Sequence, residues 1–316
     1  MVVRRLYTRE EFLKLPVEEV AEIVRAEGVP KVGVFMLDGS RRAAMLFKNL
    51  DPTSDGFFDK MIYETGTEFI NNVKTIFDHG IHTLMIPTMN HANFNRNKKY
   101  IEKSLNVAFN CLFKDDVWLK FYEDYDIKVR VYGDFNYIMS KGLVHLKEMV
   151  DEIMELTAHH KKHRLFWGIG CTNNIEQARL MDMAVEFYKK HGRIPTTDEK
   201  FEMYYGEYIE PVDFLIRATE MRDSGVFPSL VDAHKTQLYF PVAPTTLSMT
   251  PDTFRRILYD LLYSRTRIFA IKEYGMEDIS GSILDEVREY YRKNMFAVIG
   301  LGTAKGKFWL PDKWSE

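Results

Sequence analysis

Cysteine is nearly absent from this chain of 316 residues, which contains only Cys111 and Cys171. Two cysteines cannot form a disulfide framework or a cysteine-based zinc site. The sequence also lacks an apolar run of the roughly 18 residues that a membrane-spanning helix needs, and its first residues lack an apolar signal segment. We therefore expect a cytoplasmic protein without stable membrane insertion.

A surplus of charge of one sign is missing as well. Lysine and arginine together number 43, aspartate and glutamate number 46, and the formal net charge is −3. This balance does not favour bulk binding to nucleic acid or to an anionic membrane surface, so we expect neither partner. Hydrophobic residues make up 46% of the chain, which is enough for a substantial core.

Linker-like stretches rich in proline, glycine or serine are also missing, so we expect residues 1–316 to form a single domain. Six short apolar runs predict strands, and most are continuous enough to be buried on both faces of a parallel sheet. These runs are Lys31–Leu37, His82–Thr88, Lys128–Gly133, Arg164–Gly168, Asp213–Arg217 and Leu238–Ala243. They predict an α/β fold, in which helices flank a six-stranded, mostly parallel sheet.

Segments of helical periodicity lie around and between these runs. The expected helices are Glu11–Arg25, Phe57–Phe77, Lys98–Tyr125, Ile138–His160, Asn174–Lys190, Pro251–Ser264 and Ile279–Lys293. After the last of them, Ala297–Leu301 and Lys307–Leu310 predict a short C-terminal hairpin.

The end of the first expected strand carries the strongest functional signal. The run ends on Asp38, Gly39 permits a tight turn, and Arg41 and Arg42 follow where a helix is expected to begin. Backbone N–H groups at a helix N-terminus and two guanidinium groups suit a polyanion, and an aspartate beside them can hold a divalent cation or a proton. Diphosphate with a metal ion is the ligand that this combination favours, although an Asp-Gly pair alone is more often a surface turn.

Two other strand ends carry polar groups that we expect to lie near Asp38. The second expected strand leads into Asn90–Arg96, and the fifth ends in Arg217, with Arg222 and Ser224 close behind. Ligands of open α/β sheets bind beyond the carboxyl ends of the strands, where these groups would converge.

Two conspicuous motifs have simpler interpretations. The glycine-rich stretch Gly300–Lys307 has no helix after it, so we interpret it as a turn in the terminal hairpin rather than a phosphate loop. The histidines of His159–His163 flank two lysines at a helix end, which favours a solvated C-terminus over a metal cluster.

The string from Asp38 to Arg42 resembles the first motif of the cis-prenyltransferases, which usually reads Asp-Gly-Asn-Gly/Arg-Arg. Further stretches that carry the resemblance are Glu11–Pro16, Val20–Arg25, Phe77–Ile81, Tyr204–Tyr208, Leu238–Pro244 and Arg255–Asp260. The whole chain resembles the cis-prenyltransferase superfamily, and more closely its diterpene-synthase branch.

The resemblance implies roles for particular residues. Asp38 matches the essential aspartate, which implies a catalytic role and a place beside Mg²⁺. The implied diphosphate-binding residues are Gly39, Ser40, Arg41, Arg42, Arg96, Arg217, Arg222 and Ser224, and Asn93 is a further implied catalytic residue. The diterpene-synthase branch also uses a tyrosine after the first motif. Spacing from Phe77 places Met61 at that position, and we assign the role to Tyr63, two residues away.

Departures from the family pattern bear on the reaction. Chain-elongating members supply a metal-binding glutamate in the phrase Thr-Glu-Phe-Tyr-Phe, where this chain has Gln237. A neutral amide is a poorer magnesium ligand than a carboxylate. A Gly-Gly-Arg element of the family is likewise replaced by Gly168–Cys171. Both departures disfavour condensation with a second diphosphate.

The resemblance, together with these departures, implies a terpene synthase whose substrate is an allylic diterpenyl diphosphate, expected to be a bicyclic C20 compound. The enzyme would ionise the substrate and quench the cation with water, with Asp38 or Tyr63 as the base. Two alternatives remain open: a cis-prenyltransferase that condenses an allylic diphosphate with isopentenyl diphosphate, and a non-catalytic subunit of the same fold. The resemblance also implies a homodimer.

Overall fold

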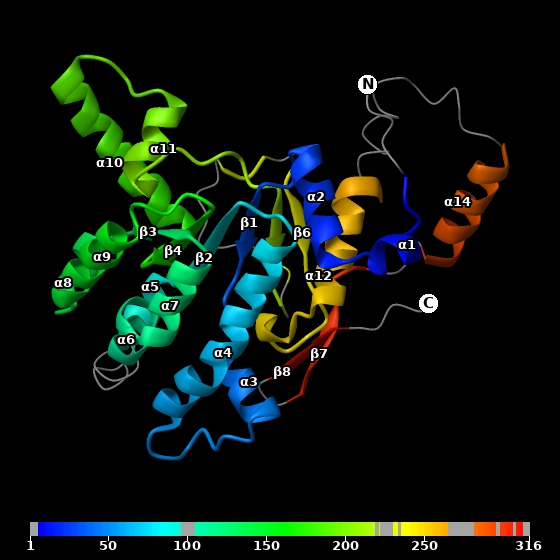
Figure 1. The fold of residues 1–316 in the computed structure, drawn as a ribbon, viewed down its shortest axis with the longest axis horizontal. Coiled ribbons are helices and arrows are strands. Elements are labelled where there is room, and N and C mark those ends of the chain that lie inside the picture. The colour runs from blue at the N-terminus through cyan, green and yellow to red at the C-terminus, as the bar shows by residue number, and fades with distance from the viewer. Residues whose placement is uncertain are drawn as a thin grey trace.

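Six parallel strands form the centre of the computed structural model (Figure 1). The structure describes residues 6–95, 105–218, 221, 230–232, 235–264, 281–294, 298–305 and 308–311. The sheet order is β3-β4-β2-β1-β5-β6, and all neighbouring strands pair in parallel, which confirms the predicted sheet. The strands are β1 (Val32–Phe35), β2 (Thr83–Met89), β3 (Ile127–Gly133), β4 (His163–Ile169), β5 (Phe214–Ile216) and β6 (Gln237–Tyr239).

Helices connect the strands, as the alternating sequence pattern predicts. They are α1 (Arg9–Leu13), α2 (Val17–Glu27), α3 (Ser40–Phe47), α4 (Phe57–Asp78), α5 (His91–Phe94), α6 (Asn106–Lys114), α7 (Asp116–Asp124), α8 (Phe135–Ser140), α9 (His145–Leu156), α10 (Asn173–His191), α11 (Thr197–Tyr205), α12 (Pro251–Tyr259) and α14 (Gly281–Asn294). None of these described helices is long and apolar enough to cross a membrane.

Three of the expected helices are each divided in two. Proline has no N–H group to continue a helix, and Pro16 separates α1 from α2. Asp115 accepts a hydrogen bond from Val117 N and so begins α7 directly after α6. Gly142 has a φ of +85° and lies between α8 and α9. Each break has a local cause that helical periodicity alone does not reveal.

Buried side chains cover both faces of the sheet. On one face, α2, α4, α6, α7, α9 and α12 pack in a large cluster that includes Phe35 of β1. On the other face, Val32 and Val34 of the same strand contact a second cluster, which contains residues of α10 and α11. Figure 1 shows α10 and α11 together at one end of the sheet. Strand residues thus alternate between two buried layers, which explains why the strands read as continuous apolar runs.

The predicted C-terminal hairpin is also present, although its strands lie a few residues from their expected positions. It consists of β7 (Gly302–Lys305) and β8 (Phe308–Pro311), which pair antiparallel. The stretch that we interpreted as a turn rather than a phosphate loop therefore supplies one strand of this hairpin.

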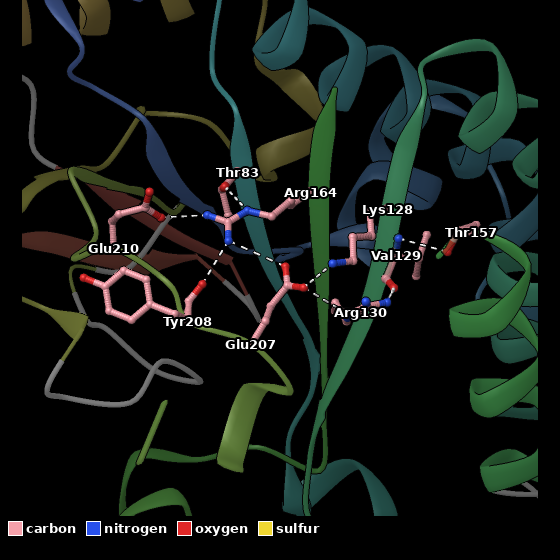
Figure 2. A network of polar contacts seen from close by, with 9 residues as sticks. All are labelled: Thr83, Lys128, Val129, Arg130, Thr157, Arg164, Glu207, Tyr208 and Glu210. Carbon is pink, nitrogen blue, oxygen red and sulfur yellow. Dashed lines mark hydrogen bonds and ion pairs between the residues drawn. The ribbon is translucent and has the colours of Figure 1, made fainter. Parts of the chain in front are cut away.

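A network of charged side chains joins the segment after α11 to the sheet (Figure 2). Arg164 of β4 donates to Glu210 Oε2 at 2.7 Å and to the carbonyl oxygen of Tyr208 at 2.9 Å. Glu207 pairs with Lys128 and Arg130 of β3. Because Arg164 and Lys128 are the second residues of their strands, this network holds the amino ends of β3 and β4.

Candidate active site

Asp38 lies just beyond the carboxyl end of β1, between two arginines. Arg42 Nη2 lies 3.1 Å from Asp38 Oδ1, and Arg217 Nε lies 3.4 Å from Asp38 Oδ2. Arg217 follows the last residue of β5, which pairs directly with β1, so the sheet itself places this guanidinium beside Asp38. The side chain of Arg217 is only 9% exposed, which fixes its charge at this position.

The backbone of Asp38 is held by two buried threonines. The carbonyl oxygen of Asp38 accepts hydrogen bonds from Thr245 Oγ1 at 2.9 Å and from the Thr246 N–H at 3.1 Å. Arg42 Nε donates to the carbonyl oxygen of Pro244 at 2.6 Å. The loop before α12 therefore fixes both Asp38 and its arginine partner.

Gly39 makes the turn from β1 into α3 possible. Its φ is +83°, a conformation that side chains disfavour. A Cβ at this position would also lie 2.5 Å from the carbonyl oxygen of Pro244. Helix α3 begins at the next residue, and its first residues Ser40, Arg41 and Arg42 line the cavity described below, so the positive end of the helix dipole adjoins the site. This geometry is the helix N-terminus that the sequence predicted for anion binding.

A cavity of about 1050 Å³ opens beside this turn. Its polar end is lined by Asp38, Gly39, Ser40, Arg41, Arg42, Asn90, Asn93, Arg217 and Lys305. Among these described residues Asp38 supplies the only carboxylate, against four basic side chains, so this end favours an anion. The volume is slightly above the roughly 300–1,000 Å³ that is usual for small-molecule sites.

The remainder of the cavity is apolar. Side chains from α4, α6, α7 and β2 enclose it, and they include Phe57, Phe58, Met61, Ile62, Phe69, Met89, Leu105, Ala108, Leu112 and Trp118. Phe69 and Trp118 pack against each other with ring centroids 5.7 Å apart. The cavity thus joins a cationic end to a long hydrocarbon-compatible end lined with aromatic rings.

The structure brings together most of the predicted site residues that it describes. Asp38, Gly39, Ser40, Arg41, Arg42, Asn93 and Arg217 all line the cavity. Asn93 lies in α5, where its side chain also accepts a hydrogen bond from the backbone N–H of Asn90. The predictions for Arg96, Arg222 and Ser224 fall outside the described residues.

The structure contradicts the role that we assigned to Tyr63. Its side chain is 82% exposed and does not line the cavity, whereas Met61 is buried and does. Helix α4 directs Met61, Thr65 and Phe69 inward at intervals of four residues. A residue two positions after Met61 is rotated by about 200° and faces away. The spacing of apolar residues on α4 therefore indicates which side of the helix faces the cavity.

The sequence did not predict Lys305 as a site residue. It lies in β7 of the terminal hairpin, yet it lines the polar end of the cavity. No local pattern predicts this contact, because it depends on where the hairpin packs against residues that are more than 200 positions earlier in the chain.

Gln237 does not lie at the cavity in this chain. It pairs with Phe214, which pairs with Gly33 near the amino end of β1, and its side chain donates to the carbonyl oxygen of Lys235. Asp38 follows the opposite end of β1. The difference between glutamine and glutamate therefore has no direct effect on Asp38 within one chain.

A buried carboxylic acid lies behind the cavity on the α10 side of the sheet. Glu176 is fully buried, and burial raises its pKa to about 8, although the neighbouring Tyr204 hydroxyl lowers the pKa in part. Cys171, which lines the cavity, belongs to the same buried cluster as Tyr132 and Tyr205. Because its pKa is raised to about 8, Glu176 is mainly protonated at neutral pH in the folded protein.

The fold and the site together define a class of enzyme, in which a parallel sheet presents an anion-binding turn above an apolar cavity. The family model described as putative undecaprenyl diphosphate synthase matches residues 36–244. Tuberculosinyl adenosine transferase of Mycobacterium tuberculosis (strain CDC 1551 / Oshkosh) is 33% identical over 311 residues, 97% of this chain and 99% of that protein. The chain therefore belongs to the cis-prenyltransferase family of enzymes, which act on prenyl diphosphates.

Solved structures confirm the fold. A probable undecaprenyl diphosphate synthase from Campylobacter jejuni is similar with a TM-score of 0.51 and 18% identity, over 74% of this chain and 95% of that chain. Lavandulyl diphosphate synthase from Lavandula x intermedia, solved with dimethylallyl diphosphate, is similar with a TM-score of 0.58 and 17% identity, over 74% and 96%.

Proposed function

We propose that this protein is a diterpene synthase. It ionises an allylic C20 diphosphate, expected to be bicyclic, and quenches the carbocation with water. The products are a diterpene alcohol, inorganic diphosphate and the proton that the attacking water loses. The observation that carries the proposal is the cavity, in which a cationic turn adjoins an apolar chamber of the size needed for one large hydrocarbon.

The cationic end stabilises the leaving diphosphate. Arg41, Arg42 and the N-terminal end of the α3 dipole supply positive charge to the anion as the carbon–oxygen bond breaks. Asp38 orients Arg42 and Arg217 through its two carboxylate oxygens. Loss of one preorganised group of this kind costs about 3–4 kcal/mol of transition-state stabilisation, or about 10²–10³ in rate.

Asp38 also fits a magnesium site. It is the only carboxylate among the described lining residues, and each oxygen has a second lone pair beyond its contact with an arginine. Magnesium in phosphate sites is usually held by one or two carboxylates together with substrate phosphates. When bound there, Mg²⁺ would neutralise charge on the diphosphate.

The apolar end protects the carbocation. Phe57, Phe58, Phe69 and Trp118 present aromatic rings to the cavity, and a cation near a ring face gains about 0.5–2 kcal/mol. The same side chains exclude bulk water, so the cation is captured by a molecule that the polar end admits. Asp38 is the acid–base group at that end and, since Tyr63 lies elsewhere, our remaining candidate for the base.

A second candidate function differs only in the acceptor. The relative that is 33% identical is named for transfer to adenosine, so the same ionisation followed by capture of a nucleoside is the alternative that sequence similarity favours. The cluster of Asp38, Arg42 and Arg217 supports catalysis over a purely structural subunit, because it gathers a buried guanidinium and two partly buried charges at the end of a cavity that can take an anion. A homodimer stays a proposal that rests on the family resemblance.

Incubation with linear and bicyclic allylic C20 diphosphates, Mg²⁺ and ¹⁸O-labelled water tests this proposal. We expect release of diphosphate and an alcohol that carries the label, as measured by mass spectrometry. Parallel reactions with adenosine distinguish the acceptors, because an unlabelled terpenyl nucleoside in place of the alcohol would support the second candidate. Intact substrate in every reaction would contradict both.

A further inference from the structure

Two histidines and a glutamate lie together far from the cavity. The sequence favoured a solvated helix C-terminus for the histidines of His159–His163, but the structure buries His160 and His163. Glu123 belongs to the last turn of α7, and His159 and His160 belong to the turn between α9 and β4. One ligand-type atom from each residue lies within 4.8 Å of the other two. Because β3 and β4 begin immediately after these segments, the group lies at the amino ends of the strands, opposite the carboxyl ends that carry the cavity.

Asp126 fixes the orientation of the His160 ring. His160 Nδ1 lies 2.8 Å from Asp126 Oδ1, and Nδ1 must be the donor because a carboxylate only accepts. The same carboxylate accepts hydrogen bonds from the backbone N–H groups of Lys161 at 3.2 Å and Lys162 at 3.0 Å. The side chain of His160 is only 4% exposed, so this orientation is held by packing as well. Nε2 is consequently the ring atom that faces outward, toward Glu123.

The contact between His160 and Glu123 requires a cation. Nε2 lies 3.2 Å from Glu123 Oε2. When Nδ1 carries the ring proton of a neutral imidazole, both facing atoms are acceptors, and only a second proton or a metal ion makes their approach favourable. Two ligands of a tetrahedral zinc ion, with bonds of roughly 2.0–2.1 Å, are about 3.3 Å apart. The observed separation of 3.2 Å fits two ligands of one ion as well as it fits an ion pair with a doubly protonated ring.

We propose that Glu123, His159 and His160 bind one divalent transition-metal ion of the zinc type, with Asp126 as the positioning residue. Imidazole nitrogen suits Zn²⁺, Ni²⁺ or Cu²⁺, whereas Mg²⁺ takes oxygen ligands, so this site and the Asp38 site select different ions. A carboxylate hydrogen-bonded to the second nitrogen of a ligating histidine is typical of metal sites. The ion would join α7 to the turn before β4, and it takes no part in the reaction at the cavity.

Titration of the chelator-treated full chain with Zn²⁺ tests the site. In isothermal calorimetry with Mg²⁺ in excess, at about pH 8 where imidazoles are usually neutral, we expect one ion per chain. His159→Ala and Glu123→Gln change exposed side chains and should each weaken binding by about tenfold or more, as should Asp126→Asn, because loss of such an outer partner typically costs about 10–100-fold. His191→Ala, at an exposed histidine of α10, is the matched control and should bind as the unaltered chain does.

Co²⁺ provides a second readout that does not depend on stability, because its visible absorption reports tetrahedral coordination. We expect a tetrahedral spectrum with the unaltered chain and its loss in His159→Ala, while circular dichroism shows that the variant is folded. Absence of saturable Zn²⁺ binding would show that His160 merely forms ion pairs with its two carboxylates. Equal affinity in His159→Ala and His191→Ala would likewise overturn the proposal.

Discussion

Gly39 is a single residue on which the geometry of the anion-binding turn depends. Its left-handed φ of +83° lets the chain leave β1 and enter α3 at once, and the absence of a side chain lets Pro244 approach. The contacts of Asp38 with Thr245 and of Arg42 with Pro244 exist only while this approach is close. Conformational freedom and space are therefore both required at one position.

Gly39→Ala should impair diphosphate binding more than it impairs folding. Alanine in a left-handed conformation costs about 1–2 kcal/mol, and the added methyl group would also push Pro244 away from Arg42. We expect kcat/KM to fall by roughly tenfold or more, since displacement of a charged partner costs about 1.4 kcal/mol or more, as measured by diphosphate release.

Gly28→Ala is the control for this substitution. Gly28 also has a positive φ, +71°, but a Cβ there would meet nothing within 4 Å. The control should lose a similar amount of stability and retain its activity. Equal losses of activity in the two variants would show that the close approach to Pro244 is unimportant.

At the scale of elements, α4 determines the width of the apolar chamber. Its inward residues Met61, Thr65 and Phe69 line the cavity, and a small separate cluster of Ala44, Phe57 and Met61 joins α4 to α3. The two ends of the site are therefore connected through one helix.

Met61→Trp should narrow the chamber and exclude the hydrocarbon of the substrate. The larger ring would take up cavity volume that the hydrocarbon needs, so we expect kcat/KM for a C20 diphosphate to fall by roughly tenfold or more, which corresponds to about 1.4 kcal/mol. Tyr63→Trp places the same ring on the exposed side of α4 and should leave kcat/KM unchanged. If the variant at Tyr63 were the one that lost activity, the assignment of the inward face of α4 would be wrong.

The sequence predicts elements well and their distant contacts poorly. Apolar runs predict all six strands, and they are most continuous in the inner strands, where both faces of the sheet are buried. The position of Arg217 beside Asp38 follows from the topological rule that strand ends converge. No such rule predicts the position of Lys305, since only the packing of the terminal hairpin brings this residue to the cavity. The catalytic role predicted for Tyr63 was wrong for a different reason. It relied on the presence of a tyrosine, whereas the helical period of α4 places position 63 on the exposed side.

At the scale of the whole molecule, Glu176 couples stability to pH. Its pKa of about 8 in the folded protein lies above the pKa of 4.5 of an unperturbed glutamate side chain. Between these values the unfolded chain releases a proton that the folded chain retains. The free energy of unfolding therefore falls as pH rises through this window, by about 1.4 kcal/mol for each unit over which only the unfolded chain is ionised.

Glu176→Gln should remove that slope. Glutamine has nearly the shape of the protonated acid, so the melting temperatures of variant and unaltered chain should agree near pH 5 and diverge toward about pH 8, with the variant more stable. Glu186→Gln, at an exposed position of the same helix, should follow the unaltered chain. Parallel pH profiles for all three proteins would contradict a protonated Glu176.

The central claim is that Asp38 and its arginines ionise one allylic diphosphate. Its most direct test is product analysis with a bicyclic C20 diphosphate, with and without isopentenyl diphosphate, for the unaltered chain, Asp38→Asn and the control Asp252→Asn. Asp252 pairs with Arg256 on the exposed side of α12, so this control also removes a charge beside an arginine. We expect the same unextended product in both conditions, a kcat lower by about 10²–10³ in Asp38→Asn, and normal turnover in the control. Prenyl diphosphates of C25 or longer, or a loss of less than about tenfold in Asp38→Asn, would contradict the account.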